Sequence, residues 1–303
     1  MNDYTIVNQV IILFFLMAAG FVAKKRDIID NNTIKKLSEV LVRITLPAMI
    51  IYSYNRQFSK ELLAKGGIML AYSLAIHLFG IFLGSVLYRK YPRNIKDVLK
   101  FITIYSNCGY MGLPVLEALY GQTGVFLGSI YVTVFNLFTW TNGVMIFTGK
   151  GDVKSIKNAL LSPGIIAIFI GLAIFFFPVK LPYPVLKTLE ILGTMTTPLS
   201  MLIIGALIAN TEFKSLFSGS SLYYSTVIRL ILLPLLTLAV LKIAGITDHV
   251  LLGSCVATAA MPAAANTAVF AERYGGDSIF ASRVVAFQTL LSMITIPAIL
   301  ILV

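Results

Sequence analysis

The chain has 303 residues, of which 58% are hydrophobic and only 12% are charged, with a formal net charge of +11. So few charges cannot solvate a soluble protein, in which about a quarter of the residues are charged, and apolar stretches of about 20 residues predict transmembrane helices instead. The Lys and Arg residues stand in short gaps between these stretches, as membrane topology requires, which argues against a nucleic-acid partner.

Ten apolar stretches predict ten transmembrane helices, so we expect an all-α integral membrane protein. The first stretch is not a signal peptide, because no positive charge precedes it and Lys24, Lys25 and Arg26 follow it. In chain order the expected spans are 4–23, 37–54, 66–88, 97–120, 122–148, 160–178, 185–209, 219–243, 248–273 and 278–303.

The gaps between the spans differ in positive charge. Fifteen Lys and Arg residues stand in the odd-numbered gaps and six in the even-numbered gaps. Cytoplasmic loops carry the excess of positive charge, so the odd gaps are expected in the cytoplasm. Both termini are then extracytoplasmic, in a multi-pass protein of the plasma membrane.

Short motifs recur with an offset of about 150 residues, which indicates an internal duplication. Residues 1–150 are expected to form one five-helix repeat and residues 151–303 a second. Because five is odd, the repeats insert with opposite topology, and inverted repeats suggest alternating access around a site in the membrane. The recurring pairs are ITLPAM (44–49) with MTTPLSM (195–201), FNLF (135–138) with FQTL (287–290), and SNCGYMGLPV (106–115) with TAAMPAA (258–264).

Spans four and nine carry helix-breaking residues near their middles. In span four, Gly109 and Gly112 loosen the backbone, and Pro114 lacks an N–H and clashes with the preceding turn. In span nine, Pro262 lies at the same depth. Free backbone groups at that depth are tolerated only where protein or a water-filled cavity satisfies them. We therefore expect helices 4 and 9 to be broken and to cross, with a second half-helix starting at each proline.

The two second half-helices would start in one small volume and point to opposite sides of the membrane. Their positive ends, each about half an elementary charge, suit a carboxylate. Asn107 and Asn266 supply amide donors beside these ends, and Asn136 and Gln288 add two more from spans five and ten. The carbonyl ends of the first half-helices could hold a cation, although nothing in the sequence requires one. Proline kinks and small residues also serve ordinary helix packing, but their recurrence in both halves favours a functional crossing.

Three ionisable residues inside the spans are candidates for coupling or gating, because a charge at the membrane centre costs about 2.5–3.5 kcal/mol on insertion scales. Arg229 of span eight could contact a substrate carboxylate, pair with an acid, or reach a lipid headgroup. His77 of span three could relay protons or serve in packing. Glu117, one turn after Pro114, could couple transport to protons or face an outer vestibule.

The motifs of spans four, five, eight and nine together resemble the auxin efflux carrier family, which includes plant auxin exporters and bacterial malate and malonate permeases. The resemblance covers essentially the whole chain and implies a fold related to that of the bile-acid sodium symporters. It implies a scaffold of helices 1, 2, 6 and 7, through which homodimers form, and a transport domain of helices 3–5 and 8–10. Asn107 and Asn266 match the family's crossover asparagines, and the short gap at 149–159 resembles compact bacterial members. The motifs are NCGYMGLP, FNLFTWTNG, RLILLP, and MPAAAN followed by YG.

No nucleotide-binding loop, hydrolase motif or metal-ligand spacing occurs in the sequence, so we expect no enzyme activity, no cofactor and no metal site. We expect a secondary active transporter of small organic carboxylate anions, auxin-like or malate- or malonate-like, with elevator-type alternating access in the lipid membrane. The coupling ion, a proton or sodium, stays open, as do the substrate and the direction of transport. Two alternatives also stay open: a non-transporting receptor or sensor with the same fold, and a sodium-coupled symporter of the bile-acid type.

Overall fold

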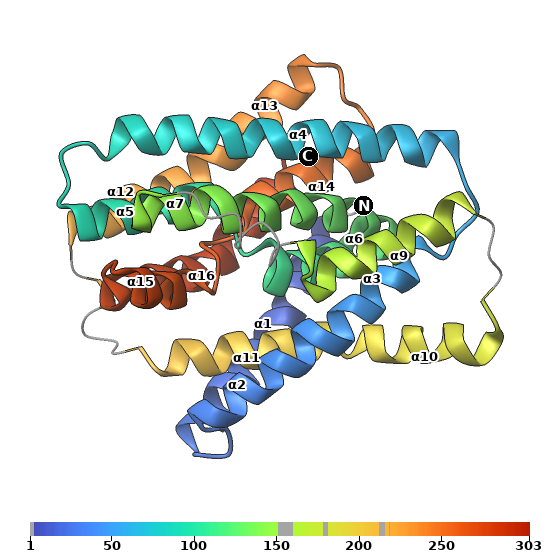
Figure 1. Ribbon diagram of the computed structural model, residues 1–303, viewed down its shortest axis with the longest axis horizontal. Helices are drawn as coiled ribbons and strands as arrows, with labels where there is room; N and C mark the ends of the chain where they lie inside the picture. Colours follow the sequence, from blue (N-terminus) through green and yellow to red (C-terminus); the bar gives the residue numbers. More distant parts are fainter. Residues whose placement is uncertain (1–2, 151–159, 178–180, 212–215, 218) are drawn as a thin grey trace.

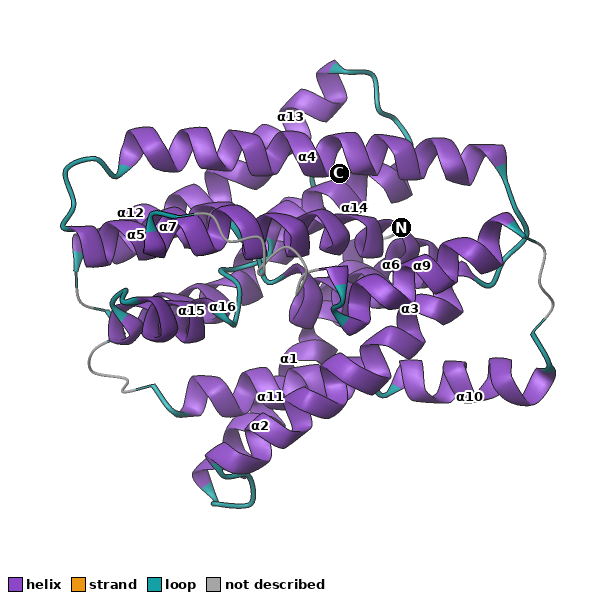
Figure 2. Cartoon of the chain, in the orientation of Figure 1, coloured by secondary structure: helices purple, strands orange, loops and turns teal. Residues whose placement is uncertain are grey.

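A computed structural model describes residues 3–150, 160–177, 181–211, 216–217 and 219–303. Within these ranges the chain is helical and contains no strand, which confirms the all-α prediction (Figure 2). Among the described residues, six segments are long and apolar enough to cross a membrane: Val7–Lys25, Lys60–Leu87, Cys108–Thr148, Tyr183–Ala209, Ser220–Ile243 and Ser278–Leu300. Two more apolar helices in the same ranges, Pro163–Phe176 and His249–Ala260, are shorter than a full membrane span. The division into ten spans in inverted repeats stays a prediction.

The predicted orientation depends partly on residues outside the described ranges. Four of the lysines that contribute to the charge difference between the gaps lie outside the described residues: Lys154, Lys157, Lys180 and Lys214. The orientation therefore stays a prediction from the positive-inside rule.

The helices of the predicted scaffold pack mainly on one another, and we call them the first helix set. Helix α1 packs along α11, and α3 packs on α9 and α10. Helices α2, α3, α10 and α11 lie in the lower part of Figure 1. The set consists of α1 (Asp3–Lys25), α2 (Asn31–Val40), the π-helical turn η1 (Leu41–Thr45), α3 (Leu46–Tyr54), α9 (Pro163–Phe176), α10 (Tyr183–Thr194) and α11 (Thr196–Ala209).

Two glycines bring α1 and α11 together backbone to backbone. A Cβ atom on Gly20 would overlap the carbonyl of Leu202, and one on Gly205 would overlap the carbonyl of Met17. Small residues at such contacts are typical of helix packing in membranes, where close backbone approach supplies van der Waals contact. This pair of helices therefore forms a tightly packed unit within the first helix set.

The remaining helices form a second helix set. Helix α4 packs on α5 and α6, α13 packs on α14, and α15 packs on α16. The set consists of α4 (Lys60–Leu87), α5 (Arg93–Ile104), η2 (Cys108–Gly112), α6 (Leu113–Phe138), η3 (Thr139–Gly143), α7 (Val144–Thr148), α12 (Ser220–Val227), η4 (Ile228–Leu232), α13 (Leu233–Ile243), α14 (His249–Ala260), α15 (Thr267–Tyr274) and α16 (Ser278–Leu300).

The long helical segment Cys108–Thr148 is not a single straight rod. Its 41 residues would measure about 60 Å as one helix, twice the hydrocarbon thickness of a bilayer. At Gly121 the backbone has φ 57° and ψ −147°, a conformation open to glycine. The chain reverses there, and Gly124 and Gly128 then pack directly against Leu116. The reversal falls between the predicted spans four and five.

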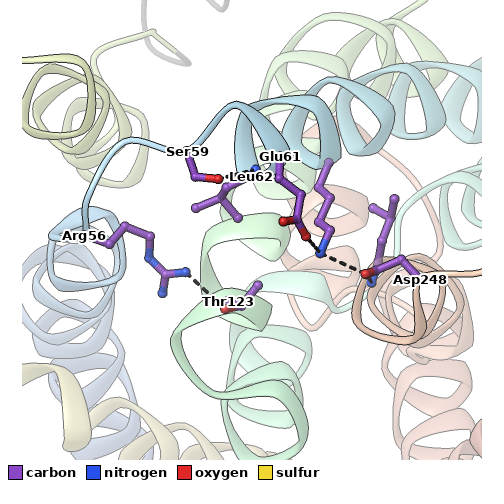
Figure 3. Close-up of polar contacts among 8 residues, drawn as sticks. Arg56, Ser59, Glu61, Leu62, Thr123 and Asp248 are labelled. Atoms are coloured by element: carbon purple, nitrogen blue, oxygen red, sulfur yellow. Dashed lines mark hydrogen bonds and ion pairs between the residues drawn. The ribbon is translucent and has the colours of Figure 1, made fainter.

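Polar contacts join the helices at the end of the molecule that lies to the right in Figure 1 (Figure 3). Lys65 of α4 forms ion pairs with Glu61 at 2.7 Å and with Asp248, which precedes α14, at 2.8 Å. Arg56, just after α3, donates a hydrogen bond to the hydroxyl of Thr123 in α6 at 3.0 Å. The ion pairs thus link α4 to α14, and the Arg56 contact links the two helix sets.

Candidate functional site

The helices of predicted spans four and nine are both interrupted, and their interruptions touch. Residues 105–107 separate α5 from η2, and residues 261–266 separate α14 from α15. Ser106 and Ala263 pair as in an antiparallel sheet, and they form an isolated β-bridge outside any strand. We call these two segments the paired breaks.

Backbone groups in the paired breaks satisfy one another. The N–H of Asn107 donates to the carbonyl of Pro262 at 2.7 Å, and the N–H of Ala264 donates to the carbonyl of Tyr105 at 3.1 Å. Non-helical backbone at membrane depth requires such partners, because the hydrocarbon supplies none. The pairing therefore allows two neighbouring helices to be interrupted at the same place.

The prediction that each second half-helix starts at its proline is wrong. Helix η2 begins at Cys108, and Pro114 lies in the first turn of α6, which continues it. Pro262 lies in the extended break, and α15 begins only at Thr267. The backbone pairing fixes where the helices end and restart, so the prolines flank the restart points without marking them.

The two helix starts carry the predicted asparagines. Asn107 is the N-cap residue of η2 and Asn266 is the N-cap residue of α15, but neither side chain caps its own helix. The Nδ2 atom of Asn107 and the Oδ1 atom of Asn266 are buried without a hydrogen-bond partner among the described residues. Buried polar atoms are nearly always paired, so these two are available to a ligand or to water.

Gln288 of α16 holds one of the paired breaks in position. Its side chain is fully buried, and its Oε1 atom accepts a hydrogen bond from the N–H of Ala263 at 3.0 Å. The prediction gave Gln288 an amide that lines the pocket, whereas the residue does not border the cavity described below. Gln288 instead supports the backbone that presents the site.

Arg229 is almost completely buried beside the paired breaks, with 1% of its surface exposed. Its guanidinium donates to the carbonyls of Met261 at 3.0 Å, Ala259 at 3.1 Å and Thr103 at 3.2 Å. Among the described residues no carboxylate lies within 4.0 Å of it. Of the alternatives for Arg229, this environment argues against an acid partner and a lipid headgroup, because the side chain binds backbone carbonyls inside the protein.

A cavity of about 560 Å³ opens beside Asn107, between α11, α15 and α16. Its apolar wall includes Ile204 and Leu207 of α11 and Ala286 of α16, and its size is within the range of small-molecule sites. The polar residues of its lining are Asn107, Asn210, Thr211, Ser282, Arg283 and Thr289.

Arg283 is the residue that sequence reasoning missed. A guanidinium binds carboxylates through two parallel N–H donors, and Arg283 borders the same cavity as Asn107. The signal was present, because an arginine inside an apolar span is costly and marks a functional candidate.

Comparison with known proteins identifies the family. The family described as membrane transport protein matches residues 5–159 and 152–300, nearly the whole chain. The chain belongs to this family. The resemblance to the auxin efflux carriers is thereby confirmed, and the protein is a membrane transporter and not an enzyme.

Relatives match this transporter over almost their full lengths. The uncharacterized transporter MJ1031 of Methanocaldococcus jannaschii is 26% identical over 96% of this chain and 96% of its own length. An uncharacterized transporter of Methanothermobacter thermautotrophicus is 23% identical over 96% of both chains. The uncharacterized transporter YfdV of Escherichia coli K12 is 22% identical over 96% of this chain and 95% of its own.

His77 of this transporter lies in an aromatic environment. Its Nδ1 atom is 2.7 Å from the carbonyl of Ser73, one turn earlier in α4. The imidazole ring lies 5.2 Å from the ring of Tyr131 and 5.3 Å from that of Phe138, centroid to centroid. This environment favours packing over proton relay for His77.

Glu117 joins the two helix sets. Its Oε2 atom accepts a hydrogen bond from the hydroxyl of Thr197 in α11 at 2.7 Å. The carboxylate is therefore engaged at the interface between the sets, and its role in coupling or gating stays a prediction.

The other predicted site residues of the transporter do not border the cavity. Gly112 packs on the second break, where an added Cβ would lie 3.4 Å from Cγ of Met261. Gly109 faces open space, Pro114 is buried in the first turn of α6, and Asn136 is half-buried on α6. Gly112 therefore allows η2 to approach the second break closely, whereas roles of Gly109, Pro114 and Asn136 in substrate binding stay predictions.

Proposed function

We propose that this transporter carries small organic carboxylate anions by secondary active transport, with the substrate bound where the two broken helices cross. The observation that carries the proposal is the cavity beside Asn107, which combines a helix start, an unpartnered buried amide and the guanidinium of Arg283. Both auxin-like and malate- or malonate-like acids share the carboxylate that this arrangement suits.

Electrostatics support an anionic substrate. Each half-helix start contributes about half a positive charge, and its free N–H groups bind anions directly. Arg283 adds a positive charge to the cavity wall, and guanidinium groups suit carboxylates. The apolar side chains of α11 and α16 suit the carbon skeleton of an organic acid better than an inorganic ion.

The arrangement of the helices supports elevator-type alternating access. The cavity lies between α11 of the first helix set and α15 and α16 of the second, so its wall is shared between the sets. In Figure 1, α15 lies toward the left end, while the end of α3 and the start of α4 lie toward the right. At the right end, the Arg56–Thr123 hydrogen bond joins the first helix set to the second.

In the proposed motion, the second helix set carries the anion past the first, and the Arg56–Thr123 and Glu117–Thr197 contacts break as the opposite side opens. The first helix set, in a homodimer, stays fixed in the membrane. If the odd-numbered gaps are cytoplasmic, the present cavity faces the cytoplasm. Cross-linking of the protein in membranes checks the dimer, and trapping of single cysteines on α11 and α15 checks the motion.

Binding measurements on the purified protein test the proposed substrate class. Malonate, malate and indole-3-acetate serve as probes, and a ligand at 100 times its Kd stabilises the folded protein by about 2.7 kcal/mol. We expect Asn107→Ala and Asn266→Ala to abolish this stabilisation, while Asn94→Ala, at an exposed position of α5, leaves it unchanged. Equal stabilisation of all three variants would refute the site, and binding of only neutral or cationic compounds would refute the substrate class.

Uptake into proteoliposomes separates a transporter from the receptor alternative. A transporter accumulates a radiolabelled probe that binds, and a receptor binds it without uptake. Because the family and its relatives are transporters, we expect uptake that depends on Asn107 and Asn266.

A further inference from the structure

The first half-helices of the paired breaks end in carbonyl groups that their own helices leave unpaired. In a continuous helix the carbonyl of Thr103 would accept from the N–H of Asn107, but that N–H is bound to Pro262. The carbonyl of Ala259 would likewise accept from the N–H of Ala263, which is bound to Gln288. Opening the two helices therefore leaves carbonyl oxygens without partners inside the protein.

Arg229 supplies the missing donors. Its Nη1 atom binds the carbonyl of Thr103 at the end of α5, and its Nη2 and Nε atoms bind the carbonyls of Ala259 and Met261 at the end of α14. One guanidinium thus binds the ends of two helices from opposite halves of the chain. The π-helical turn η4, in which Arg229 lies, begins one residue before it.

The charges also balance. Each helix end carries about half a negative elementary charge, so two ends together offset the single positive charge of one guanidinium. Among the described residues no carboxylate lies within 4.0 Å of Arg229. The buried cation is therefore neutralised by backbone and not by an acid.

Carbonyl groups at the ends of broken helices are also what cation-coupled transporters use to bind sodium. We propose that the Arg229 guanidinium is a fixed internal cation at the crossing, so that anion binding requires no sodium ion. This inference deepens the proposed function, since it concerns the coupling ion of the same site. It disfavours the sodium-coupled alternative, because the carbonyls that would bind sodium are already bound to the guanidinium.

The first test uses the wild-type protein. The affinity for malonate and the melting temperature are measured in sodium and in choline salts of equal ionic strength. We expect malonate affinity to change less than about twofold, whereas a coupled ligand changes its partner's affinity by about 5- to 150-fold. A sodium-specific increase within that larger range overturns the inference. If malonate, malate and indole-3-acetate all fail to bind, the proposed function fails, and the second test still decides the role of Arg229.

The second test removes the guanidinium group of Arg229 by mutation and then adds free guanidinium ions to the solution. Arg229→Ala should melt at a lower temperature, and millimolar guanidinium, but not choline, should raise its melting temperature toward the wild-type value. The matched control is Arg89→Ala, since Arg89 donates to the single carbonyl of Ser85 at an exposed position. An equal guanidinium response in both variants overturns the inference. If Arg229→Ala does not fold, Arg229→Lys replaces it, with partial loss of stability and no gain from sodium expected, and a sodium-dependent gain overturns the inference.

Discussion

The substitution Gln288→Leu tests whether the side chain of Gln288 holds the break between α14 and α15 in position. The substitution keeps a side chain of similar size but removes the acceptor for the N–H of Ala263, which lies 3.0 Å from Oε1. Both residues are fully buried, so the N–H is left without a partner at a cost of about 1–3 kcal/mol. A loss of 1 kcal/mol lowers Tm by about 2–4 °C in proteins somewhat smaller than this one, so we expect a decrease of roughly 2–12 °C.

The measurement is the melting temperature of the purified protein in detergent, with Gln57→Leu as the matched control at an exposed loop position. Gln288→Glu keeps an acceptor oxygen and should retain more of the stability than Gln288→Leu. If Gln288→Leu melts within error of Gln57→Leu, then α16 does not hold the break, and the role assigned to Gln288 is refuted.

Three further predictions concern contacts away from the cavity. A double-mutant cycle with Glu117→Ala and Thr197→Val should give a coupling energy of about 0.5–3 kcal/mol, measured by thermal unfolding, and a value near zero would show that the two side chains do not interact. Gly205→Ala should lower Tm because the new Cβ meets the α1 backbone, whereas Gly67→Ala, in open space, should not; equal effects would refute the packing. Asp248→Asn should cost about 0.2–1 kcal/mol at low salt by breaking the ion pair with α4, and a cost that persists in molar salt would contradict this cause.

The helical fold was predictable because it follows from composition. A chain with 58% hydrophobic residues in stretches of about 20 satisfies its backbone in lipid only as helices, given its lack of strand-like alternation. The approximate positions of the breaks were also visible, since Gly and Pro weaken helices wherever they stand.

The register of the breaks was not predictable from local sequence. The position of Pro114 predicted a helix start six residues later than the one in the structure, because η2 begins at Cys108. The deciding interaction is the hydrogen bond from Asn107 to Pro262, which joins residues from different halves of the chain. Local helix-breaking rules carry no information about such a partner.

The role of Arg229 was hidden for the same reason. Its acceptors are backbone carbonyls, which every residue has, so no motif marks them. Thr103 and Ala259 lie 126 and 30 residues away in the chain. The sequence showed that the charge was costly, and only the folded chain shows what offsets it.

The chain reversal at Gly121 also sets the length of the helix that starts at the first of the paired breaks. From Cys108 to the reversal the helix rises about 20 Å, whereas the eight residues of α15 rise about 12 Å before Gly275 ends the helix with φ 84°. On the other side of each break, α5 and α14 each have 12 residues and rise about 18 Å, so the helix between Cys108 and Gly121 is the longest of the four helical segments that meet at the paired breaks. One residue inserted between Leu113 and Tyr120 would move the crossing by about 1.5 Å and rotate it by about 100°.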